Sequence, residues 1–215
     1  MMPSPTEAAS ADASAAVEDR RHDRRMAWFL VVAGLVGLLA AFTLLVEKIA
    51  LIEDPTYVPS CSINPILSCG SIMRTDQAEA FGFPNPIIGI AGFSIVITTG
   101  MTILAGATLR RWFWLGLQAG ATFGVGFIHW LIFQSLYRIG ALCPYCMIVW
   151  VAVIPLFWYT TLHNVRAGHI RLPLPAGRLA ALAREFHGVV LATWYLAIVG
   201  LIANRFWEYW SGLLT

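Results

Sequence analysis

The chain has 215 residues, of which 58% are hydrophobic and 12% are charged, and its mean hydropathy is +0.70. A soluble domain of this length does not need so large an apolar fraction for its core, so the composition predicts an integral membrane protein. The formal net charge is only +2, and the basic residues stand in short clusters between apolar runs. This pattern argues against a nucleic-acid-binding face.

The N-terminal segment is rich in alanine, serine and charged residues and closes with two pairs of arginines. It has too little apolar content to fold, so we expect residues 1–25 to form a disordered cytoplasmic tail. The apolar run at residues 26–46 is too long for the core of a signal peptide and ends without a convincing cleavage site. We therefore expect it to remain as a transmembrane anchor.

Four more apolar runs are long enough, or nearly so, to cross a bilayer core of roughly 30 Å. They cover residues 87–109, 112–136, 142–161 and 189–204. The sequence predicts an all-α integral membrane protein, with a four-helix transmembrane bundle and a fifth transmembrane helix. The expected segments are the tail 1–25, the catalytic bundle 26–165 with its outer loop 47–86, a basic cytoplasmic connector 166–188, and the fifth helix and C-terminus 189–215.

The distribution of basic residues predicts the orientation. With a cytoplasmic N-terminus, ten of the fourteen lysines and arginines lie on the inner side and four on the outer side, as the positive-inside rule requires. The inner ones are Arg20, Arg21, Arg24, Arg25, Arg110, Arg111, Arg166, Arg171, Arg178 and Arg184, and the outer ones are Lys48, Arg74, Arg138 and Arg205. All four cysteines then face the outer compartment, where disulfides persist. This favours a multi-pass membrane protein whose N-terminus is cytoplasmic and whose cysteines lie on the outer side.

The cysteines form two pairs, Cys61 and Cys69 in the first outer loop and Cys143 and Cys146 at the start of the fourth span. In Cys143-Pro144-Tyr145-Cys146 the two sulfurs lie one helical turn apart, and free amide donors at a helix start lower a thiol pKa. We expect Cys143, at the surface, to exchange disulfides. Cys146 lies about 4.5 Å deeper, on the side from which a membrane-dissolved oxidant would arrive.

Two other interpretations of the cysteines are weighed against a redox relay. The first is a structural or transport membrane protein with stabilising disulfides, although a disulfide one turn long constrains almost no chain entropy. The second is a four-cysteine zinc site, although seven residues between Cys61 and Cys69 is wider than the spacing usual in zinc knuckles.

The outer loop contains two further features. Ile63, Ile66, Leu67, Ile72 and Met73 stand roughly at helical spacing, which predicts a short amphipathic segment on the membrane surface that caps a cavity. The motif Phe-Gly-Phe-Pro-Asn-Pro then holds Asn85 at the membrane boundary. The Asn85 amide is either a hydrogen-bond donor for a polar ligand or a turn residue.

Three polar residues near the spans have a structural interpretation as well as a functional one. His129, inside the third span, is interpreted as a neutral histidine bonded to the helix backbone or a neighbour. Glu47 and Lys48, at the end of the first span, are interpreted as interfacial anchors whose charged ends snorkel to water.

The order of these motifs resembles the vitamin K epoxide reductase family in its bacterial form, over about residues 26–165. The resemblance implies a four-helix bundle around a quinone. It implies that Cys146 reacts with the quinone, Cys143 exchanges with Cys69 and Cys61 meets the partner protein, while Asn85 bonds a quinone carbonyl. Trp150 occupies a position where some members have an aromatic hydroxyl, and its indole can stack on a ring or donate a hydrogen bond.

The resemblance therefore predicts a membrane thiol:quinone oxidoreductase that supports disulfide formation in exported proteins, with menaquinone or ubiquinone as the quinone. Many bacterial relatives continue into a thioredoxin-like domain, whereas this sequence ends at Thr215, so we expect a separate thioredoxin-fold donor protein. A second class of quinone-coupled disulfide-forming proteins places the CxxC pair before the spaced pair, opposite to the order in this chain.

Overall fold

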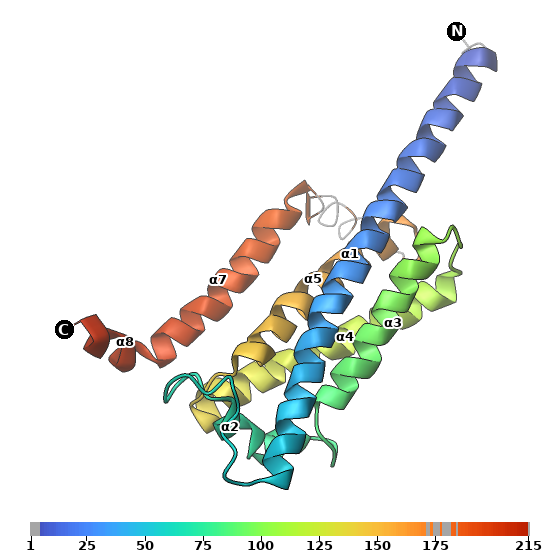
Figure 1. Ribbon diagram of the computed structural model, residues 1–215. Helices are drawn as coiled ribbons and strands as arrows, with labels where there is room; N and C mark the ends of the chain where they lie inside the picture. The colour runs from blue at the N-terminus through green and yellow to red at the C-terminus, as the bar shows by residue number, and fades with distance from the viewer. Residues whose placement is uncertain (1–4, 171–172, 174–176, 178–181, 184, 215) are drawn as a thin grey trace.

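We describe the fold from a computed structural model, which describes residues 5–170, 173, 177, 182–183 and 185–214. Four long helices lie side by side as a bundle, and a fifth runs along one flank (Figure 1). The helices are α1 Pro5–Glu53, α2 Cys69–Met73, α3 Pro86–Leu104, α4 Arg111–Gln134, α5 Pro144–Arg166, α7 His187–Arg205 and α8 Trp207–Leu214. A 3-10 turn, η1 Asp76–Glu79, follows α2, and a π-helical turn, η2 Ser135–Ile139, ends α4.

Five helical segments of the described chain are long and apolar enough to cross a membrane, which confirms the predicted fold class. They are Arg20–Glu53, Pro86–Leu104, Arg111–Ile139, Pro144–Arg166 and His187–Arg205. The expected basic connector is described only in part, and its residues Arg171, Arg178 and Arg184 lie outside the described residues.

Helix α1 continues well beyond the bundle toward the N-terminus (Figure 1). The expected disorder of the tail is therefore wrong for residues 5–25, which are helical. Low apolar content removes packing partners, but alanine has the highest helix propensity. Extending an existing helix also avoids the unfavourable nucleation step, so an alanine-rich segment can prolong a transmembrane helix without a core of its own.

The loop between α1 and α3 is also less helical than expected. Within the expected segment only Cys69–Met73 forms an α-helix, whereas the preceding residues turn back on themselves. The Asn64 Oδ1 atom accepts hydrogen bonds from the amides of Ile66 and Leu67, at 3.0 and 2.7 Å. An asparagine that bonds its own backbone competes with helix formation, so the apolar spacing over residues 63–67 does not produce an amphipathic helix.

Helix α7 is attached to the bundle by hydrogen bonds as well as by apolar packing. The Trp194 indole donates to His129 Nε2 at 2.9 Å, and His129 Nδ1 lies 2.7 Å from the Val125 carbonyl. Because an indole nitrogen can only donate, Nε2 is the acceptor and the Nδ1 proton bonds the carbonyl. Both ring nitrogens of His129 are thus bonded, one to its own helix backbone and one to a neighbour, as interpreted from the sequence.

Helices α1 and α3 approach closely because of glycines. A Cβ at Gly100 would lie 2.7 Å from the Ala27 carbonyl oxygen and 2.7 Å from the Val31 Cγ2 atom. Membrane helices commonly use small residues in this way, since packing replaces the hydrophobic driving force that lipid does not supply. The α1 and α3 contact holds the two helices that carry the loop with the first cysteine pair.

We expect Gly100→Ala to destabilise the protein by about 1–3 kcal/mol, because the added methyl group meets backbone atoms that cannot rotate away. Thermal unfolding of the purified protein in detergent, followed by circular dichroism, measures the loss. Gly126→Ala on α4 is the matched control, since a Cβ there has nothing within 4 Å. Equal melting temperatures for the two variants would contradict the close α1 and α3 contact.

Candidate active site

The first cysteine pair is closed as a disulfide. Cys61 and Cys69 are bonded to each other, with their Cα atoms 5.6 Å apart. Cys69 is the first residue of α2, whose N-cap Ser68 accepts a hydrogen bond from the Ser71 amide. Both cysteines are buried, at 5% and 0% exposure. The segment leading to Cys61 is held against α1, because Glu47 accepts hydrogen bonds from the Tyr57 hydroxyl and from Ser60.

A short backbone pairing brings the second cysteine pair to the first. Residue Leu67 pairs with Leu142 in an isolated parallel bridge. The Ser68 amide donates to the Leu142 carbonyl at 2.9 Å, and the Leu142 amide donates to the Ile66 carbonyl at 2.7 Å. Each cysteine follows this pairing directly, so the Cys69 and Cys143 sulfurs lie 2.9 Å apart although 74 residues separate them.

Cys143 caps the N-terminus of α5. Its sulfur accepts a hydrogen bond from the Cys146 amide at 3.4 Å, and Pro144 occupies the first helical turn. Proline suits that position because its missing N–H would have no partner there. The pKa of Cys143 is lowered from its usual value, chiefly because the Cys146 thiol donates to its sulfur and also because nearby backbone amides do so. The lowered pKa favours the thiolate form of Cys143, the form in which a sulfur leaves or attacks in disulfide exchange.

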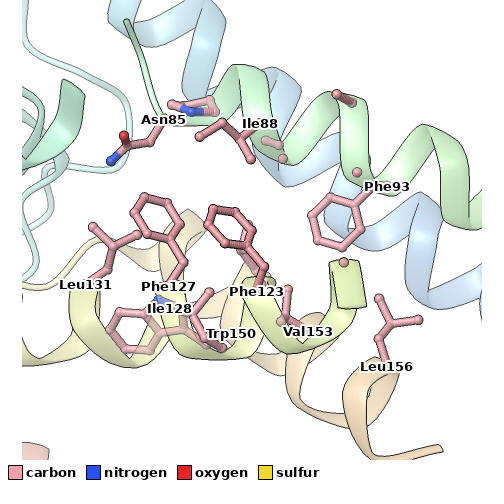
Figure 2. Close-up of a pocket in the computed structure, with 18 of the residues that line it drawn as sticks. Asn85, Ile88, Phe93, Phe123, Phe127, Ile128, Leu131, Trp150, Val153 and Leu156 are labelled. Carbon is pink, nitrogen blue, oxygen red and sulfur yellow. The ribbon is translucent and has the colours of Figure 1, made fainter. Parts of the chain in front are cut away.

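Cys146 connects the sulfurs to a large apolar cavity. The cavity has a volume of about 590 Å³, and its lining residues come mainly from α1, α3, α4 and α5 and include Cys146 and Asn85. Figure 2 shows Phe93, Phe123 and Phe127 directed into this space, with Asn85 near one end. Its volume falls in the range typical of small-molecule sites, and its apolar walls suit a flat hydrophobic ring.

Asn85 lines the cavity but already holds the loop that precedes α3. Its Nδ2 atom donates to the Gln77 carbonyl at 2.7 Å, and its Oδ1 atom accepts from the Ala80 amide at 3.1 Å. A side-chain amide carries two N–H donors, so one remains for a ligand. Both interpretations of Asn85 drawn from the sequence, turn residue and ligand donor, are thus compatible with its position.

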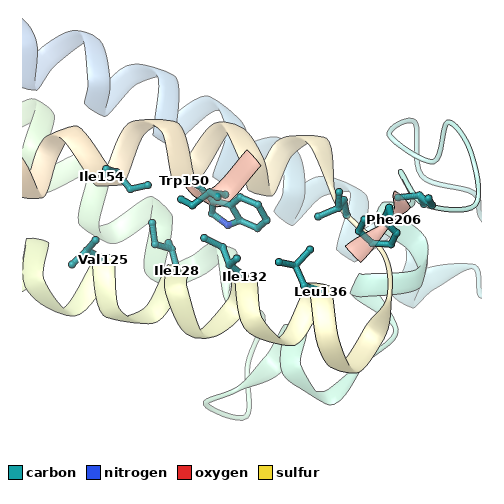
Figure 3. Packing of buried hydrophobic residues seen from close by; sticks show 10 residues of the cluster. Val125, Ile128, Ile132, Leu136, Trp150, Ile154 and Phe206 are labelled. Carbon is teal, nitrogen blue, oxygen red and sulfur yellow. The ribbon is translucent and has the colours of Figure 1, made fainter. Parts of the chain in front are cut away.

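Trp150 also lines the cavity, and it is 4% exposed. Its ring packs between α4 and α5 against Ile128 and Ile132 (Figure 3). Trp150 therefore belongs to the hydrophobic core as much as to the cavity wall, and its substitution would alter both.

The interpretation of Glu47 and Lys48 as snorkelling anchors is wrong. Glu47 is 7% exposed and bonds the cysteine loop, and the Lys48 side chain is 12% exposed. The Lys48 ammonium donates to the Met73 carbonyl at 2.7 Å and forms an ion pair with Glu79 at 2.8 Å. Lys48 also lines the cavity. Helix α1 continues past both residues to Glu53, and nothing in the sequence signals that the loop folds back over them.

The sulfurs of Cys61, Cys69 and Cys143 lie within 4.8 Å of one another, a grouping that could hold a metal ion. Metals bind thiolates, however, and two of these three sulfurs are joined in a disulfide. Cys146 continues the series toward the cavity instead of completing a four-thiolate centre. The arrangement favours thiol exchange over a zinc site.

The comparisons with known proteins agree with this chemistry. The model of the vitamin K epoxide reductase family matches residues 28–161, a segment that contains all four cysteines and the cavity-forming helices. No curated protein matches the chain. Because the match spans more than half of the sequence, the chain belongs to the vitamin K epoxide reductase family, membrane oxidoreductases that link thiol–disulfide chemistry to quinones.

Proposed function

We propose that this protein reoxidises a separate thioredoxin-fold disulfide donor and passes the electrons to a membrane quinone, either menaquinone or ubiquinone. The observation that carries the proposal is the continuous series of sulfurs from Cys61 through Cys69 and Cys143 to Cys146, which ends at an apolar cavity. Such a series moves two electrons by bond exchange alone, without a metal or flavin.

The proposed relay begins at Cys61. A donor thiolate attacks the Cys61 sulfur and breaks its bond to Cys69, and the second donor thiol then releases the oxidised donor. The Cys69 thiolate attacks Cys143 in the Cys143–Cys146 disulfide and frees Cys146. Cys61 next attacks Cys69, which restores the Cys61–Cys69 disulfide and leaves Cys143 and Cys146 reduced.

In the proposed cycle, the state after this internal exchange has one closed and one open cysteine pair. Cys61 and Cys69 are disulfide-bonded, whereas Cys143 and Cys146 are free. In the proposed cycle both electrons then reside on the pair beside the cavity. Re-forming the Cys143–Cys146 disulfide delivers two electrons to the quinone, which takes them with two protons.

The proposed location is the bacterial inner membrane, with the cysteine end of the bundle facing outward and the N-terminus in the cytoplasm. The support is the asymmetry of basic residues. Arg20, Arg21, Arg24, Arg25 and Arg166 stand at the end of the bundle opposite the cysteines, together with Arg110 and Arg111. An outward-facing cysteine end places the relay in a compartment where disulfides form.

We expect the purified protein, kept anaerobic, to reduce quinone when a reduced thioredoxin-fold donor is supplied, with one quinone consumed per donor dithiol. This ratio follows because each carries two electrons. The absorbance of the quinone measures how much quinone is reduced, and trapping of the donor thiols measures how much donor is oxidised. Parallel assays with menaquinone and ubiquinone analogues identify the preferred acceptor. Donor oxidation that proceeds equally without quinone would contradict the proposal.

A further inference from the structure

Lys48 is the one charged residue among the described residues that line the cavity. The other lining residues are apolar apart from a few uncharged polar side chains, which include Gln77, Asn85 and Ser135. A buried charge is costly unless it is paired, and Lys48 meets this condition through Glu79. Pairing makes the charge tolerable, but it does not explain why a charged residue lines a cavity proposed to bind an uncharged apolar ring.

The contacts of Lys48 fix its ammonium near the cysteine end of the cavity. Nζ donates to the carbonyl of Met73, the last residue of α2, and pairs with Glu79 in η1. The Lys48 side chain thus links α1 to the part of the loop that follows the Cys61–Cys69 pair. An ammonium has three N–H donors, and these contacts use two of them. The third is left for another acceptor, and both Lys48 and its partner Met73 line the cavity.

A purely structural role explains the contacts of Lys48 less well than a role toward a bound molecule does. An ion pair with a carboxylate that is 40% exposed contributes little to stability. A cation beside an apolar cavity acts differently, because the low dielectric strengthens its attraction to negative charge that develops on a bound molecule. Quinone reduction places such charge on the two ring oxygens.

We propose that Lys48 is a catalytic residue that donates a hydrogen bond, and then a proton, from Nζ to one quinone oxygen. This inference rests on the proposed function. Cys143 and Cys146, when they share a single proton, supply two electrons and that proton as their disulfide forms. The Lys48 N–H bond breaks to supply the second proton, which completes the hydroquinone, and the neutral amine then regains a proton from water at the loop surface.

Three variants separate the catalytic role from the structural one. Lys48→Met removes the charge and keeps the chain length, Lys48→Arg keeps the charge, and Glu79→Gln breaks the ion pair but retains the ammonium. We expect Lys48→Met to lower kcat for quinone reduction about 100-fold, as loss of a single preorganised donor does. We expect losses within about tenfold for Lys48→Arg and within about fivefold for Glu79→Gln.

A spectroscopic measurement provides a readout besides turnover. In a Cys143→Ala background, the Cys146 thiolate against a bound quinone should give a visible absorption band. A cation near the quinone oxygen lowers the energy needed to move electron density onto the ring. Adding Lys48→Met should therefore shift the band to shorter wavelength and weaken quinone binding, whereas adding Glu79→Gln should leave the wavelength unchanged.

The possible outcomes distinguish the two proposals. If Glu79→Gln lowers kcat as much as Lys48→Met, or if Lys48→Met leaves the band in place, Lys48 is only a link between α1 and the loop and the inference fails. In either case the proposed function stands, because the unsubstituted protein still reduces quinone. If that protein reduces no quinone and the Cys143→Ala variant shows no band, the proposed function itself fails.

Discussion

Replacing Cys143 with alanine is expected to abolish quinone reduction, with turnover at least about 1,000-fold lower. Cys143 is the sulfur that lies 2.9 Å from Cys69 and also faces Cys146. Without it, no disulfide exchange can cross between the two pairs, and the cavity-side disulfide cannot form. Anaerobic turnover with a reduced thioredoxin-fold donor measures the loss.

The same variant is expected to gain a visible absorption band when quinone is added. Cys146 is the one cysteine among the described residues that line the cavity, and removal of Cys143 prevents its oxidation to the Cys143–Cys146 disulfide. A thiolate in contact with the ring donates electron density to it, and acidification should bleach the band as the thiolate becomes protonated.

Two matched variants test the assignment of the sulfurs. In the Cys143→Ala background, Asn85→Ala should weaken the band, because it removes a hydrogen bond worth about 0.5–1.5 kcal/mol and also releases the loop at Gln77 and Ala80. Cys146→Ala should be equally inactive but should show no band. A band in Cys146→Ala, together with none in Cys143→Ala, would mean that the two sulfurs have exchanged roles.

Replacing Cys69 with alanine is expected to stop donor oxidation and to trap the donor on Cys61. The remaining Cys61 thiolate can attack the disulfide of an oxidised donor, but the neighbouring thiol that normally resolves the mixed disulfide is missing. A donor that lacks its second active-site cysteine and carries the first as a mixed disulfide with a small thiol should accumulate in the adduct, because Cys61 displaces the small thiol and no neighbouring thiol remains to reverse the exchange. Non-reducing electrophoresis and mass spectrometry of the linked peptides identify the bond.

Cys61→Ala is the control for this experiment. Cys69 is fully buried beside Cys143, so in this variant the Cys69 thiolate should attack the Cys143–Cys146 disulfide, form a Cys69–Cys143 disulfide and free Cys146, and little donor should be captured. Donor attached to Cys143, with Cys61→Ala still active, would show that the loop pair does not take part in the relay.

The sequence by itself determined the class of protein and the local chemistry of the second cysteine pair. Hydropathy over about 20 residues decides whether a segment crosses a bilayer, because backbone groups in lipid must bond within the segment. The observed spans differ from the predicted ones mainly at their ends. Pro144 at the helix start likewise marks the N-terminus of α5, a signal that needs no tertiary information.

Local patterns were less dependable where side chains bond the backbone or where a helix extends into water. Asn64 replaced the expected amphipathic helix with a turn. The alanine-rich tail prolonged α1 instead of remaining disordered. In both places apolar content was the wrong guide, because a single hydrogen-bonding residue or helix propagation decided the backbone conformation.

Only the tertiary structure decided which groups meet. The contact between Cys69 and Cys143 depends on backbone bonds between Ile66–Ser68 and Leu142. The place of Lys48 in the cavity wall depends on a loop that returns to the end of α1, and no periodic pattern marks either contact. The physical reason is that spans and helix caps are set by residues within a few turns, whereas sulfur and ammonium positions are set by how segments distant in the sequence pack around one cavity.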